Sequence, residues 1–119
     1  MSCEPPNCFI ELPYTLPQDS TLFVILREKS VDIWKRKLDW IAENGGMALL
    51  NSHPDYMNCR DARGRWEEYS ISFYEEFLQY ARERYGGRFW HVLPKEMALF
   101  WKQNMVNEKD PNNQGSPRL

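Results

Sequence analysis

The chain has 119 residues, a length that suits one domain and is short for a complete barrel or a two-domain enzyme. Its 15 Lys and Arg residues against 17 Asp and Glu residues give a formal charge of -2. Because the basic residues are scattered among acidic ones, we expect no nucleic-acid partner. The composition predicts a single compact unit.

The three cysteines are an odd number without a C-x-x-C pair, so they favour neither a disulfide framework nor a zinc site. We therefore expect a cytoplasmic chain. The first residues, MSCEPPNCF, lack the basic start and apolar stretch of a signal peptide. No run approaches the roughly 18 apolar residues of a membrane span, so no membrane partner is expected.

The first half of the chain predicts short strands around one clear helix. The piece CFIEL, residues 8–12, suits a strand, and residues 22–26 suit either a buried strand or a helix capped by Asp19. From Ser30 or Asp32 to residue 44, apolar residues spaced three or four apart predict an amphipathic helix. Two glycines end it, and MALLN, residues 47–51, is expected to form a buried strand.

The second half follows the same plan after a long polar connection, residues 52–66. Ser72 and Glu75 form a capping-box pattern that predicts a helix ending before two glycines. Residues 88–93 suit a strand, and Pro94 begins a last helix that extends to residue 104. The remaining residues, 105–119, have little apolar content and are expected to be disordered.

His53 follows the expected strand 47–51, where open α/β sheets and barrels place their chemistry. An imidazole can donate or accept a proton near neutral pH, and Asp55 could orient the ring or accept its proton. The competing interpretation is an ordinary solvated loop histidine. Trp66, in the polar connection, is the aromatic residue that core packing explains least.

Three stretches together resemble the C-terminal part of bacterial polysaccharide deacetylases of the nodulation-protein type. They are ELPYTLPQDSTLF, DIWKRKLDWIAENGGMALLNSHPDYM and FYEEFLQYARERYGGRFWHVLPKEMALFW, and the resemblance covers roughly residues 9 to 102. It implies an α/β fold, an incomplete (β/α) barrel in which short strands alternate with amphipathic helices. The domain portion is then residues 1–104, followed by the tail.

The resemblance also implies a chemistry. Family members hold a divalent metal, commonly zinc, through an aspartate and an H-x-x-x-H element, and a late histidine protonates the leaving amine. His53 matches that histidine, and Leu49 and Leu50 approach the residues that line the acetyl-methyl pocket. Tyr56 and Trp66 are further candidates for substrate contact. The family's carboxylate position after the histidine holds a proline here, with the carboxylate deferred to Asp55.

The chain has no aspartate pair followed by H-x-x-x-H, so we expect no metal ligands in it and zinc only in a complete domain. This leads to two hypotheses. The first is a deacetylase-related polypeptide that acts on amino sugars of a polysaccharide when a complementary N-terminal chain, or self-association, completes it. The second is a non-catalytic module of the same fold that binds carbohydrate or protein through residues 52–66.

Overall fold

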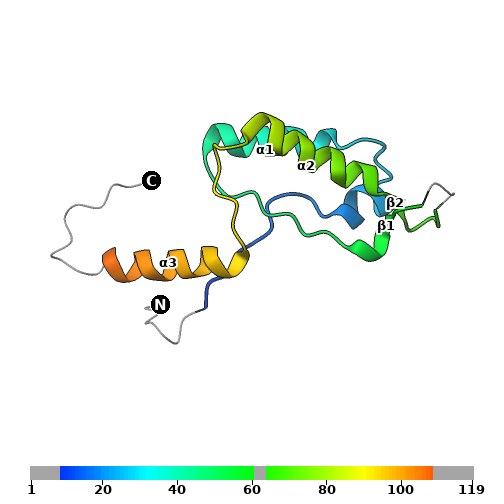
Figure 1. The fold of residues 1–119 in the computed structure, drawn as a ribbon. Helices are drawn as coiled ribbons and strands as arrows, with labels where there is room; N and C mark the ends of the chain where they lie inside the picture. The colour runs from blue at the N-terminus through cyan, green and yellow to red at the C-terminus, as the bar shows by residue number, and fades with distance from the viewer. Residues whose placement is uncertain (1–8, 61–63, 109–119) are drawn as a thin grey trace. The chain divides into compact units, whose positions relative to one another are not determined.

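The computed structural model describes residues 9–60 and 64–108 (Figure 1). The chain divides into two compact units, where the composition predicted one. The larger unit is Pro13–Phe89, and the smaller combines the described residues of Met1–Leu12 and Trp90–Leu119. The described residues mix helix with two short parallel strands, as expected for a broadly α/β chain.

The amphipathic helix α1, Asp32–Asn44, confirms the clearest prediction from the sequence. Its apolar face buries Trp34 and Ile41, while Trp40 on another face stays 55% exposed. The helix ends at Gly45, whose φ of 72° lies in the left-handed region that glycine adopts without strain.

The apolar run near residue 20 forms a helix and not a strand. It is a six-residue π-helix, η1, Ser20–Ile25, in which the Leu26 N–H donates to the Thr21 carbonyl at 2.9 Å. Asp19 caps it by accepting from the Ser20 N–H at 2.7 Å, as the capping alternative predicted. The turn directs the adjacent Leu22 and Phe23 into the core together, whereas a strand would direct them to opposite faces.

The strands expected at residues 8–12, 47–51 and 88–93 are absent from the described residues. Residues 47–51 instead contact the segment around Thr15 through both backbone and side-chain bonds. The N–H groups of Thr15 and Leu16 donate to the Leu49 carbonyl at 2.9 and 3.2 Å. The Thr15 hydroxyl donates to the Met47 carbonyl at 2.8 Å and accepts from the Leu49 N–H at 3.0 Å. Because the Thr15 side chain supplies some of the bonds that a neighbouring strand would otherwise supply, the segments lie together without forming a ladder.

One of the two strands lies inside residues 52–66, the region expected to be a loop, and the other follows shortly after it. Strand β1, Met57–Asn58, pairs in parallel with β2, Tyr69–Ser70, in a register that sets Met57 opposite Tyr69. Just before β1, residues Pro54–Tyr56 form one 3-10 turn, η2. This short sheet pairs the middle of the long polar connection with the residues just after it, beside the core.

Helix α2, Ile71–Tyr85, begins at a different cap from the one the sequence suggested. The capping side chain is Ser70, whose hydroxyl accepts from the Ser72 N–H at 3.3 Å, so the predicted Ser72 and Glu75 capping box is wrong. Ser70 has the extended backbone of a cap residue because it ends β2.

The core of the larger unit lies between η1, α1, α2 and β2. The rings of Phe23 and Trp34 meet edge to face at 5.1 Å, and Trp34 lies 5.1 Å from Phe77. Figure 1 shows α1 and α2 side by side, and the Asp39 carboxylate joins them by accepting from the Tyr80 hydroxyl at 2.7 Å. The buried residues are Leu16, Leu22, Phe23, Val31, Trp34, Ile41, Tyr69 and Phe77.

In the smaller unit, helix α3 spans Pro94–Glu108. Pro94 opens it as predicted, and the Glu96 carboxylate accepts from the Leu93 N–H at 2.8 Å. The rings of Trp90 and Phe100 meet at 5.2 Å. The helix continues four residues past the predicted boundary at 104, so residues 105–108 are helical where a disordered tail was expected. The rest of that tail, 109–119, lies outside the described residues.

Candidate functional site

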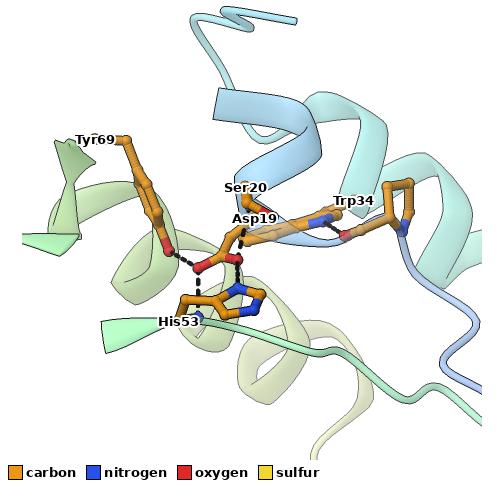
Figure 2. A network of polar contacts seen from close by, with 6 residues as sticks. Asp19, Ser20, Trp34, His53 and Tyr69 are labelled. Atoms are coloured by element: carbon orange, nitrogen blue, oxygen red, sulfur yellow. Dashed lines mark hydrogen bonds and ion pairs between the residues drawn. The ribbon is translucent and has the colours of Figure 1, made fainter. Parts of the chain in front are cut away.

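The Asp19 carboxylate is fully buried and lies at the centre of a polar network (Figure 2). Its Oδ1 lies 2.6 Å from Nδ1 of His53 and 2.7 Å from the Ser20 N–H. Its Oδ2 accepts from the His53 backbone N–H at 2.7 Å and from the Tyr69 hydroxyl at 2.8 Å. Four hydrogen bonds therefore satisfy the one charged side chain that is buried among the described residues.

These bonds decide the ionisation of Asp19. Burial alone would raise its pKa, but the His53 ring and backbone, the Tyr69 hydroxyl and the Ser20 N–H together lower the pKa below the ordinary 3.8. The pKa of Tyr69 is raised above the ordinary 10.0 by burial, by the hydrogen bond to the Asp19 carboxylate and by the negative charge of that carboxylate. At neutral pH the pair is therefore a carboxylate and a neutral phenol.

Three separate elements position the network. Asp19 is the cap of η1, His53 immediately precedes η2, and Tyr69 belongs to β2. The indole N–H of Trp34 donates to the Pro17 carbonyl at 2.8 Å, which ties the chain before Asp19 to α1. The backbone bond from His53 to Asp19 fixes the histidine's main chain as well as its ring.

The ionised carboxylate defines the tautomer of His53. A carboxylate can only accept, so Nδ1 carries a hydrogen and donates it to Asp19. The other ring nitrogen, Nε2, is then a proton acceptor when the ring is neutral and a donor when it is charged. The His53 side chain is 36% exposed, and its ring centroid lies 5.4 Å from that of Tyr56. The network can therefore hold one nitrogen while the other exchanges a proton.

Asp55, predicted as a catalytic partner of His53, is exposed in η2. The carboxylate on the His53 ring is Asp19, which corrects the expectation that Asp55 orients the ring. The reason is geometric, since His53 has extended backbone and η2 turns the chain immediately after it. Any other role of Asp55 stays a prediction.

The residues predicted to contact substrate lie in two different settings. Leu50 and Tyr56 are partly buried and pack against the core, and Leu49 is also partly buried. Trp66 is 73% exposed, with the Arg27 guanidinium 5.3 Å from its ring centroid. Tyr56 is the member of the set whose ring is near His53.

Sequence reasoning missed Asp19 and Tyr69 as members of the site. Asp19 was recognised only as a possible helix cap, a role that it also fills. It is separated from His53 by 34 positions and from Tyr69 by 50, so local spacing carries no sign of the network. An acidic residue before an apolar helical run was the one available signal.

Among residues 9–60 and 64–108, no group of three or more His, Cys, Asp or Glu side chains is arranged to hold a metal ion. The described side chains therefore do not fit the zinc site of the resembled family. None of the helices in the described part of the chain combines the length and apolar character needed to cross a membrane.

Comparisons with protein-family models, with curated proteins and with solved structures found no match to this chain. Any function of the candidate site is therefore inferred from its geometry alone.

Proposed function

We propose that the chain is the C-terminal portion of a polysaccharide deacetylase, in which His53 protonates the leaving amine of an acetylated amino sugar. The observation that supports this role is the contact of 2.6 Å between Nδ1 of His53 and the buried Asp19 carboxylate. A histidine held on one nitrogen by a buried carboxylate has the other nitrogen oriented for proton transfer.

The proposed step is a proton transfer that accompanies cleavage of the amide. As the bond between the carbonyl carbon and the sugar nitrogen breaks, Nε2–H of the charged ring gives its proton to that nitrogen. The nitrogen leaves as an amine and the acetyl group as acetate. Water supplies the second oxygen of acetate, and its protons would pass to a base on the completing polypeptide and then to solvent. The ring becomes neutral and keeps its Nδ1–H on Asp19, which holds the ring in one orientation.

The proposal includes a partner, since the described residues do not supply a metal site. A complementary N-terminal polypeptide would bring the metal ligands and the base, and would complete the incomplete (β/α) barrel. Self-association is the other route to completion. The short parallel pair β1 and β2 is compatible with an α/β unit that needs further strands.

Acetate release in the completed protein tests the proposal. The DNA upstream of this reading frame, or the neighbouring frames, should encode an aspartate pair and an H-x-x-x-H element. The joined or co-expressed polypeptides, supplied with zinc, should release acetate from N-acetylglucosamine oligomers, and His53→Gln should lower kcat by about 100-fold or more. Without such a segment, or with kcat unchanged in His53→Gln, the catalytic role fails.

A second candidate function is a non-catalytic module that binds carbohydrate or protein. The observation in its favour is the 73% exposure of Trp66, the most exposed of the five tryptophans. A module of this kind would bind its ligand without a metal-binding partner. Binding by this chain with no acetate release in any completed form would favour it.

A further inference from the structure

Trp66 lies in a short turn that hydrogen bonds hold in place. The Arg65 N–H donates to the Glu68 carboxylate at 3.1 Å, and the Glu68 N–H donates to the Arg65 carbonyl at 3.0 Å. A Cβ atom at Gly64 would lie 2.6 Å from the Asn58 side chain, so the backbone packs closely there. The turn thus holds a large apolar ring in solvent, where its hydration is unfavourable.

Arg27 supports Trp66 from a distant part of the chain. Its guanidinium carbon lies 5.3 Å from the indole centroid, and its Nη1 donates to the Trp66 carbonyl oxygen. The φ of Arg27 is 56°, the one positive φ among the described residues other than glycine. The contact leaves Trp66 73% exposed, so a charged group supports the indole without covering it.

Trp66 is also close to the His53 network through the chain. Tyr69 follows it by three positions, so their Cα atoms are at most about 11 Å apart. The Tyr69 hydroxyl donates to the same carboxylate that holds His53. A polymer bound at Nε2 of His53 could therefore extend to Trp66 within a few units.

We propose that Trp66 and Arg27 form a glycan-binding subsite, in which a pyranose ring of an amino-sugar polysaccharide stacks on the exposed indole. One face of a pyranose carries C–H groups that match an aromatic surface, and its rim carries oxygens that accept hydrogen bonds. A guanidinium has five N–H groups, so the bond to Trp66 leaves donors for those oxygens. The amino-sugar class rests on the proposed deacetylase function, whereas the subsite rests on the two side chains.

Calorimetric titration of the full chain with a β-1,4-linked N-acetylglucosamine hexamer tests the subsite. Trp66→Ala should weaken binding by about tenfold or more, and Trp66→Phe should weaken it less. Trp40→Ala is the matched control, because Trp40 is also exposed, at 55%, with Lys37 Nζ 4.4 Å from its ring centroid. Its affinity should stay within about twofold of the wild type.

Arg27→Gly separates the guanidinium from the backbone. Glycine accepts the positive φ, so the fold should be retained while the donor is lost, and binding should weaken by about threefold or more. Circular dichroism and thermal melting check the fold of each variant. A wild-type chain that does not bind the hexamer, or a Trp66→Ala variant that binds it as tightly as the wild type, would overturn the subsite.

Failure of the subsite and failure of the proposed function have different signatures. Wild-type binding that depends on Trp66, with no acetate release by the completed protein, supports the subsite and contradicts the catalytic role. Acetate release that needs His53, with hexamer affinity and KM unchanged in Trp66→Ala, supports the catalytic role and overturns the subsite.

Discussion

Nδ1 of His53 lies 2.6 Å from Oδ1 of Asp19, and the His53 backbone N–H lies 2.7 Å from the other oxygen of the same carboxylate. One buried side chain thus fixes both the ring and the main chain of the histidine. This double attachment relates stability to the proposed chemistry, since the carboxylate that orients the ring also joins two distant segments.

Asp19→Asn should lower the free energy of unfolding by about 3 kcal/mol. The amide keeps the shape of the side chain, but its nitrogen cannot accept from the donors that now meet Asp19. Urea denaturation at neutral pH measures the change. Asp55→Asn is the matched control, because Asp55 is exposed, and it should change stability by no more than about 0.5 kcal/mol.

Tyr69→Phe should cost about 1 to 2 kcal/mol of stability, because it removes the hydroxyl that donates to Asp19 at 2.8 Å and keeps the ring. A double variant that combines Tyr69→Phe with Asp19→Asn measures the coupling free energy between the two side chains. The stability losses of the two single variants should add up to more than the loss in the double variant, since both substitutions remove the same hydrogen bond. Strict additivity would show that the Tyr69 hydroxyl and Asp19 act independently.

Acid should destabilise the protein through Asp19. Its pKa is lowered in the folded chain, so its contribution is fully present above the unfolded pKa of about 4. The contribution is lost as pH falls through the lower, folded pKa. Asp39 acts in the same direction, with hydrogen bonds from Tyr85 and Tyr80 outweighing burial.

Urea midpoints measured from about pH 6 to about pH 3 test this dependence. Asp19→Asn should reduce the decline in stability over that range. A wild-type stability that does not fall with acid, or an identical decline in the variant, would contradict the ionised, hydrogen-bonded state of Asp19.

Tyr80→Phe should loosen the packing of α1 on α2 and lower stability by about 1 kcal/mol. The Tyr80 hydroxyl reaches the Asp39 carboxylate at 2.7 Å across the two helices. Gln79→Ala is the control, because it removes an exposed bond to Glu83 within α2 and should change stability by less than about 0.5 kcal/mol. Equal losses in the two variants, measured by thermal melting and urea denaturation, would contradict a contribution of the Tyr80 hydroxyl to the packing of the two helices.

The parts of the fold that the sequence predicted are those set by local patterns. Helix α1 follows from its apolar spacing and the glycines after it, and α3 begins at Pro94 as expected. The strand predictions failed because a short apolar run such as residues 47–51 can be partly buried without forming a strand ladder. There the hydroxyl of Thr15 satisfies backbone groups that a strand ladder would use.

The site was predictable only in part. His53 stood out by its type and position, but its partner could not be read from spacing, because Asp19 is 34 positions away. Asp55 was the nearer carboxylate in the sequence and is the wrong one for the ring. The contact depends on η1, because the residue that caps this helix, Asp19, is directed into the core.

The ring tautomer of His53 is the most direct test of the account. The chain has two histidines, so long-range proton–nitrogen correlation spectra of the wild type and of His91→Gln assign the His53 signals. For the neutral form of the ring we expect hydrogen on Nδ1 in the wild type and a loss of that preference in Asp19→Asn. Hydrogen on Nε2 in the wild type, or spectra that do not respond to Asp19→Asn, would contradict the proposed site.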